Sequence, residues 1–129
     1  MLELPPDTDE ETTLIYLASP YSHDDPAVRA YRFEAVCQAA ANMMLAGHVV
    51  ISPIAHSHPL FVRRPEVGAH FEQWRELDQS LIAACAEMWI LNLPGWDQSY
   101  GVSEEAKFSR ERGIPVRLVD EFGKAVEEV

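Results

Sequence analysis

Basic residues are scarce in this sequence, and their scarcity argues against a polyanionic partner. The 129 residues include 10 lysines and arginines against 21 aspartates and glutamates, which gives a formal net charge of −11. No basic cluster exceeds the pair Arg63-Arg64. A nucleic-acid groove needs a basic stripe to displace counterions, so we expect no nucleic-acid polymer as partner. A single phosphate remains compatible with this charge, because a few backbone amides can hold it.

Cysteines, phosphate-binding glycine motifs and long apolar runs are also scarce. Cys37 and Cys85 have no CxxC spacing and lie among apolar residues, so we expect buried free thiols in a reducing compartment. The chain lacks the P-loop, GxGxxG and GxSxG patterns. The first residues are acidic, unlike a signal peptide, and no apolar run reaches the length of a membrane span. We therefore expect a cytoplasmic protein that binds no membrane.

The pair His56 and His58 is the one arrangement in the sequence that resembles a metal site. No further histidine or cysteine falls at a zinc-like spacing from it, so we expect neither a metal nor another cofactor. Contact with a substrate, or packing within a loop, is the more favoured use of these two side chains.

Short apolar runs alternate with segments of helical periodicity. Four apolar runs predict strands, at residues 13–18, 49–52, 88–93 and 115–119. Three segments with apolar side chains at helical spacing predict helices, at residues 24–47, 72–86 and 102–112. The segment 54–66 carries two histidines and two prolines and predicts a long loop. Residues 1–12 are expected to be a disordered acidic leader, and 121–129 an acidic tail with at most a final helical turn.

This order of elements predicts one α/β domain over residues 13–120. Strand-to-strand crossovers are right-handed, which requires a parallel sheet covered by helices on both faces. Ligands in such folds bind beyond the carboxyl ends of the strands, where the strand order reverses. Polar and unusual residues gather after three of the predicted strands, at 18–21, 52–53 and 93–95. The sequence therefore predicts a small-molecule site at that edge of the sheet.

The segment 95–105 (GWDQSYGVSEE) leads from a strand end into a predicted helix. The unpaired amides at a helix N-terminus attract anions, so Ser99 and Gly101 are candidates to line an anion pocket. We expect Glu104 or Glu105 in the first helical turn, where the helix dipole keeps a carboxylate ionised. Such a carboxylate can attack a cation-like anomeric carbon. The alternative is that these glutamates only stabilise the helix.

Asp78 and Tyr16 are polar residues within otherwise apolar elements. Trp74, Leu77, Leu81 and Ile82 flank Asp78 and predict that its face is partly buried. A desolvated carboxyl has a raised pKa and can protonate a leaving base; an exposed helix position is the alternative. Tyr16 lies in the first strand, either as a core residue or with its hydroxyl reaching the ligand end of the sheet.

Three segments together resemble the nucleoside 2-deoxyribosyltransferase superfamily, which includes the deoxynucleoside 5′-monophosphate N-glycosidases. They are residues 14–20 (LIYLASP), Asp78 on the middle helix and residues 99–105 (SYGVSEE). The resemblance covers roughly residues 13–119. It is greatest to small bacterial and phage members with SPYS, GHVV-SPI-HSHP and LPGW-x-x-S-x-GV-x-x-E segments.

The resemblance implies a flavodoxin-like (Rossmann-type) three-layer sandwich, a homodimer or larger homo-oligomer, and an enzyme that cleaves or exchanges an N-glycosidic bond. Glu105 matches the nucleophile that attacks C1′, and Asp78 matches the aspartate that assists departure of the nucleobase. Tyr16 matches the strand tyrosine that orients the nucleophile. Ser99 is the counterpart of the serine that binds the 5′-phosphate.

The other candidate substrate contacts follow the strand ends. They are Ser19, Pro20, Tyr21, His56, His58, Trp96 and Gly101. The loop SPYS lacks the glycine and arginine found beside the phosphate in the N-glycosidases, so nucleosides and nucleotides both stay open as substrates. Water and a second base stay open as acceptors. A catalytically silent nucleotide-binding module is the alternative function. A receiver domain is disfavoured, because Ala18-Ser19 replaces the acidic pair that would end its first strand.

Overall fold

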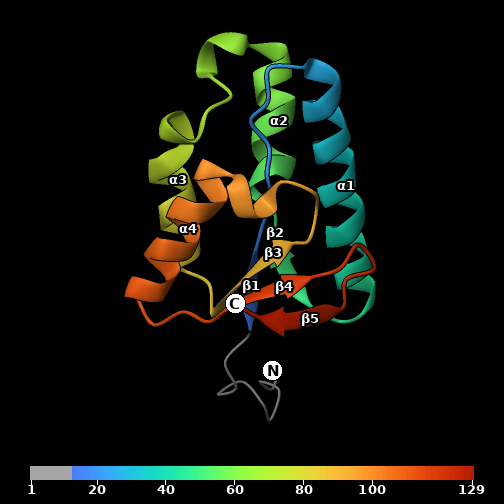
Figure 1. Ribbon diagram of the computed structural model, residues 1–129, viewed down its shortest axis with the longest axis vertical. Helices are drawn as coiled ribbons and strands as arrows, with labels where there is room; N and C mark the ends of the chain where they lie inside the picture. Colours follow the sequence, from blue (N-terminus) through green and yellow to red (C-terminus); the bar gives the residue numbers. More distant parts are fainter. Residues whose placement is uncertain (1–12) are drawn as a thin grey trace, which may run out of the picture.

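The computed structural model describes residues 13–129, in which five strands form one sheet between layers of helices (Figure 1). The strand order is β2-β1-β3-β4-β5. The strands are β1 Leu14–Ala18, β2 Val49–Ile51, β3 Glu87–Leu91, β4 Val116–Val119 and β5 Ala125–Glu128. The first four strands pair in parallel, whereas β5 pairs antiparallel with β4. The predicted flavodoxin-like sandwich is confirmed, with an antiparallel edge strand added; the predicted leader 1–12 lies outside the described residues.

The helices follow the predicted order, with one addition. They are α1 Pro26–Leu45, α2 Pro53–Arg63, α3 Phe71–Ala83 and α4 Tyr100–Glu111, with 3₁₀ turns η1 Pro65–Val67 and η2 Trp96–Gln98. The start of α1 is as predicted: the Asp25 carboxylate accepts a hydrogen bond from the Ala27 amide at 2.9 Å, and Pro26 opens the helix. Gly47 follows its end at a φ of +98°, which only glycine adopts readily.

Both faces of the sheet are buried along β1, β3 and β4, which explains the unbroken apolar run of β1. Ile15 and Leu17 of β1 pack on one face with Val36 and Met43 of α1. Tyr16, from the alternate positions of β1, packs on the opposite face against α3 and α4. The chain runs from β1 outward to β2 and then back across to β3, so the strand order reverses beside β1.

The prediction of a loop at residues 54–66 is wrong, because most of this segment is helix α2. The Ser52 hydroxyl caps the helix by accepting from the Ala55 amide at 3.2 Å, and Pro53 occupies its first position. Pro59 lies inside α2 and does not end it. The cap and the first-turn proline are both visible in the sequence, whereas Pro59 and the two histidines are typical of a loop.

The final helical turn considered for the acidic tail at residues 121–129 is not formed, because residues of this tail form strand β5 instead. A turn at Asp120, whose carboxylate accepts from the amides of Phe122 and Lys124 at 2.9 Å each, sends the chain back as β5. All four residues of β5 are exposed, and two are glutamates. Such an edge strand lacks the apolar alternation by which strands are identified.

The cysteine prediction holds for one of the two residues. Cys85 is a buried free thiol, whereas Cys37 on α1 is a half-buried free thiol. Among the helices of residues 13–129, none combines the length and the apolar character that a bilayer crossing requires.

We predict that Gly123→Ala destabilises the fold by about 2 kcal/mol or more, through left-handed strain and steric overlap. Gly123 has a φ of +85°, and a Cβ there would lie 2.9 Å from the Met43 nitrogen. Gly113→Ala is the control: its φ is +73°, but nothing lies within 4 Å of the added carbon. Urea unfolding of both variants checks this, and equal losses would show that the tail does not pack on α1 as described.

Candidate active site

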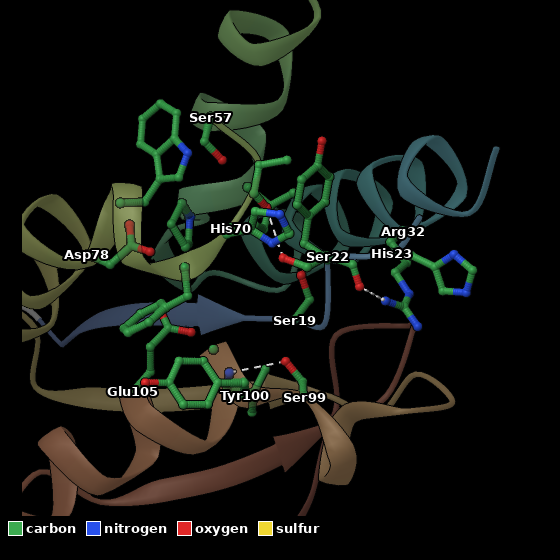
Figure 2. Close-up of a pocket in the computed structure, with 18 of the residues that line it drawn as sticks. Ser19, Ser22, His23, Arg32, Ser57, His70, Asp78, Ser99, Tyr100 and Glu105 are labelled. Atoms are coloured by element: carbon green, nitrogen blue, oxygen red, sulfur yellow. Dashed lines mark hydrogen bonds between the residues drawn. The ribbon is translucent and has the colours of Figure 1, made fainter. Parts of the chain in front are cut away.

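A cavity of about 430 Å³ lies at the carboxyl ends of β1, β2 and β3 (Figure 2). The segments that follow these strands form its floor and walls, and α3 and the first two turns of α4 contribute further side chains. The cavity therefore occupies the edge at which the strand order reverses. Six predicted site residues line it: Ser19, Tyr21, Asp78, Ser99, Gly101 and Glu105.

Glu105 and Tyr16 form a buried hydrogen-bonded pair between α4 and the centre of the sheet. The Tyr16 hydroxyl donates to the Glu105 carboxylate, and the two side chains are 0% and 5% exposed. Glu105 lines the cavity, whereas Tyr16 lies behind it. Burial, together with the negative charge of Glu105, raises the pKa of Tyr16 well above its usual value. Tyr16 therefore stays protonated and acts as a fixed donor.

The predicted position of Glu105 in the first turn of its helix is wrong. Helix α4 begins at Tyr100, so Glu105 lies in its second turn. The helix dipole acts mainly within the first turn, and so Tyr16 is the specific partner that favours the ionised form of Glu105. Glu104 lies outside the cavity lining and faces Arg75, with 3.9 Å between its Oε2 and the guanidinium Nη1. Of the two glutamates, only Glu105 lines the cavity.

Asp78 is the second buried carboxyl in the cavity, and its burial excludes the alternative of an exposed helix residue. Glu72 also lines the cavity, but it is exposed and paired with Arg75. Asp78 is 7% exposed, and burial raises its pKa to about 7. Burial, and next the charge of Asp78, raise the pKa of Glu105 to about 8, against the hydrogen bond from Tyr16. Two carboxyls that repel each other in a shared site titrate as a pair. The pair therefore holds about one proton near neutral pH.

The opposite part of the cavity presents hydroxyls. The Ser99 oxygen caps α4 by accepting from the Val102 amide at 3.2 Å, and its proton remains free to donate. Ser19 is buried, and its hydroxyl has no hydrogen-bond partner among residues 13–129. Gly101 lets the start of α4 approach α3, because a Cβ there would lie 3.3 Å from the Phe71 Cβ.

Four predicted substrate contacts do not line the cavity. Pro20 is fully buried, and Trp96 packs on the apolar core. The His58 Nδ1 lies 2.6 Å from the Tyr21 hydroxyl and its ring stacks on Phe33, so His58 supports Tyr21 from behind. His56 is exposed. The two histidines do not line the cavity because they lie on helix α2. The residues of α2 that face the cavity are Ile54, Ser57 and Phe61, at i, i+3 and i+7.

Arg32 is a cavity residue that the sequence interpretation missed. It reaches from α1 to donate to the Ser22 carbonyl at 3.0 Å, and its other terminal nitrogen lies beside Gly95. Within residues 13–129 it makes no salt bridge. A signal was present, because Arg32 occupies the first position of the stripe that continues with Val36, Ala39 and Met43. A charged residue at the end of such an apolar stripe indicates that this face of the helix continues beyond the core, here to the cavity.

Helices α3 and α2 supply further cavity residues that the sequence analysis did not identify. Phe71, Trp74 and Asp78 line the cavity from one stripe of α3 at i, i+3 and i+7. The Trp74 indole donates to the Gly68 carbonyl at 2.9 Å, which fixes its ring. Ser57 is 6% exposed and turns its hydroxyl toward the cavity (Figure 2). In the part of the chain that the structure describes, no three His, Cys, Asp or Glu side chains converge as metal ligands would.

These features define a flavodoxin-like α/β protein with a small-molecule cavity at the reversal of its strand order. Residues 13–121 match the family described as a domain of unknown function (DUF1937), and the chain belongs to that family, which is nucleoside 2-deoxyribosyltransferase-like. No curated protein sequence matches the chain.

Among solved structures, the fold is similar to that of a 2-deoxyribosyltransferase from the psychrotolerant bacterium Bacillus psychrosaccharolyticus, a biocatalyst for nucleoside synthesis. The TM-score is 0.57 at 24% sequence identity, over 89% of this chain and 77% of the other. At this identity, the similarity establishes the shared fold.

We predict that the two buried carboxyls of the cavity, Asp78 and Glu105, make the fold less stable as the pH rises from 5 to 8. Their raised pKa values mean that the folded chain binds more protons than the unfolded chain in this range, so the free energy of unfolding falls with pH. Asp78→Asn removes one charge and its repulsion of Glu105. Relative to wild type, it should be more stable at pH 8 by about 2 kcal/mol and little changed at pH 5.

Urea unfolding at the two pH values measures this difference. Asp97→Asn is the control, because Asp97 is exposed and lies outside the cavity lining. An Asp78→Asn variant whose stability follows the wild-type pH dependence would show that Asp78 carries no buried charge.

Proposed function

We propose that this protein cleaves the N-glycosidic bond of a nucleoside or nucleoside 5′-monophosphate, or exchanges its base, through a covalent glycosyl-enzyme. The observation that carries the proposal is the joint presence of Glu105 and Asp78 in one cavity, with the Tyr16 hydroxyl bonded to Glu105 alone. The hydrogen bond holds Glu105 in place for attack on the sugar and leaves Asp78 free to exchange a proton, as a nucleophile and an acid require. The fold shared with a 2-deoxyribosyltransferase supports the same reaction class.

Glu105 acts as the nucleophile. Breaking the bond between C1′ and the base nitrogen develops positive charge on the sugar, which an ionised carboxylate stabilises and then captures as an ester. Tyr16 is a positioning residue, because its hydrogen bond fixes one oxygen of Glu105 and leaves the other toward the cavity. In the second step, water or a second base attacks C1′, and Glu105 leaves as a carboxylate.

Asp78 acts as the acid for the departing base. A base nitrogen that accepts a hydrogen bond from the protonated Asp78 stabilises the proton on Asp78. Glu105 is then left without the shared proton and is ionised. As the bond to C1′ breaks, its electron pair goes to the base nitrogen, which takes that proton. In the second step the proton that the attacking water or second base loses returns to Asp78. Phe71 and Trp74 offer apolar aromatic surface beside Asp78, and the Ser57 hydroxyl can bond the base edge.

The remainder of the substrate lies toward Ser19, Ser99 and Arg32. Ser99 donates to a 5′-phosphate at the start of α4, where the Tyr100 and Gly101 amides are free of intrahelical bonds. Arg32 supplies the positive charge that the loop after β1 lacks. A phosphate in this position extends away from Glu105, which lies one turn further along α4.

A silent nucleotide-binding module is the second candidate function. A binding module gains nothing from two mutually repelling buried carboxyls, which cost stability, so the pair favours the enzyme. Incubation of the protein with nucleosides and their 5′-monophosphates, followed by chromatography of the free base, tests the proposal. The release of no base from any of them would leave the binding module as the better interpretation.

We predict that Glu105→Gln lowers base release by roughly three powers of ten or more, because an amide cannot form the ester intermediate. The amide has nearly the shape of the carboxyl, so circular dichroism should show an intact fold. Glu104→Gln is the matched control, as the adjacent residue of the same chemistry that faces Arg75 instead. If Glu104→Gln is inactive while Glu105→Gln is active, the nucleophile is the other glutamate.

We predict that Ser99→Ala discriminates against nucleotides. The variant loses one charge-assisted hydrogen bond to a phosphate, so kcat/KM for a 5′-monophosphate should fall roughly tenfold or more relative to that of the nucleoside. The ratio of the two substrates is the measured quantity, because the loss of the helix cap at Val102 affects both alike. An unchanged ratio would show that Ser99 contacts no phosphate and would favour an uncharged nucleoside as substrate.

A further inference from the structure

A second cavity, of about 350 Å³, adjoins the active-site cavity. Ser22, His23 and His70 line both, so the two spaces meet along a shared wall. That wall contains the hydrogen bond from the Ser22 hydroxyl to the Ala69 carbonyl, at 2.8 Å, which joins the loop after β1 to the segment before α3. Phe61, Gly68 and Ala69 also line both cavities, so the two spaces are immediate neighbours.

The second cavity lies at the phosphate end of the proposed substrate. Asp78 and Glu105, which would take the base and C1′, lie at one end of the first cavity, whereas Ser22, His23 and Arg32 lie at the other (Figure 2). A substrate with its base at Asp78 therefore points its 5′ group toward the shared wall. A longer 5′ group would continue into the second cavity.

Two arginines follow this path in a chain whose net charge is −11. Arg32 lines the first cavity and Arg29, one turn earlier on α1, lines the second. Arg29 is held in place: it donates to the carbonyls of His23 and Asp24 and lies over the Phe61 ring, 5.4 Å from its centroid. Asp24 is the one acidic residue of the second cavity's lining. Neither arginine forms a salt bridge within residues 13–129.

We propose that the second cavity binds a further phosphoryl group, so that the substrate class of this site is a nucleoside 5′-diphosphate. The inference rests on the proposed function for the orientation of the substrate. A guanidinium offers paired N–H donors to phosphate oxygens, and one already fixed by the backbone loses little freedom on binding. Arg32 contacts the first phosphate and Arg29 the second.

The test is isothermal titration calorimetry of the full chain carrying Glu105→Gln, which prevents turnover. The ligands are the four 2′-deoxynucleoside 5′-monophosphates and the matching 5′-diphosphates, without divalent cations. We expect the diphosphate of the preferred base to bind about tenfold or more tightly than its monophosphate, as one added charge-assisted contact predicts. Binding does not depend on chemistry, so the preference would persist even if no base release were found.

Added variants assign the preference to the second cavity. Arg29→Gln should abolish the diphosphate preference and leave the Kd of the monophosphate within about twofold, which also shows that the first cavity is intact. Because Arg29 anchors a loop, Pro65→Glu provides a second variant: Pro65 lines the second cavity alone, and a carboxylate there should repel the added phosphate. Arg110→Gln, exposed at the far end of α4, is the charge-matched control and should leave the preference unchanged.

Two results would overturn the proposal. One is that no diphosphate binds more tightly than its monophosphate. The other is a preference that survives both Arg29→Gln and Pro65→Glu, which would place the added phosphate elsewhere. Inorganic pyrophosphate serves as a further arm: a preference of the same size for pyrophosphate over inorganic phosphate would indicate a general anion site independent of the nucleoside.

Discussion

The hydrogen bond from Tyr16 to Glu105 is the interaction on which the site depends. It joins the central strand β1 to helix α4 between two buried side chains, and so fixes a carboxylate that would otherwise be free to rotate. Burying Glu105 near Asp78 is unfavourable for either charge, as the raised pKa values of both carboxyls show. The two apolar faces of the sheet offset that cost, so the same strand provides both the core and part of the energetically unfavourable site.

The sequence predicts those elements whose local signals agree with their tertiary role. β1 is an unbroken apolar run because it is covered on both faces, and α1 carries a carboxylate cap, a first-turn proline and a closing glycine. Local signals conflict in α2, where Ser52 and Pro53 start a helix that Pro59 suggests cannot continue. Only packing against α1 and β1 resolves that conflict. In β5 there is no apolar signal at all, because its pairing with β4 is made by the backbone.

The residues of the candidate site likewise divide into those that the sequence predicts and those that it does not. Asp78 stands out because it is a charge among apolar neighbours on an amphipathic helix, so a partly buried position follows from the periodicity. For Glu105 the periodicity left a choice with Glu104, and the family resemblance selected between them. Arg32 follows the same rule, but no motif surrounds it, and its contacts at Ser22 and Gly95 join segments 10 and 63 residues away. His58 is the opposite case: its place in an unusual sequence run predicts a substrate contact, whereas in the structure it supports Tyr21 from outside the cavity.

The two ends of the cavity carry opposite charge, and this gives a physical reason for the proposed orientation of the substrate. The end at Glu105 and Asp78 is acidic, with one proton between two carboxyls, whereas the end at Arg32 is cationic and unpaired within the described chain. An anionic group bound at the acidic end would add a second negative charge beside the one that the carboxyl pair already carries, which the low polarity of the site makes unfavourable. The anion of a nucleotide is thereby directed to Arg32, and the neutral base to Asp78. The net charge of −11 does not show this difference between the two ends of the cavity. Charges on the surface are screened by solvent and salt, whereas charges inside the cavity are screened much less and therefore act more strongly on a bound substrate.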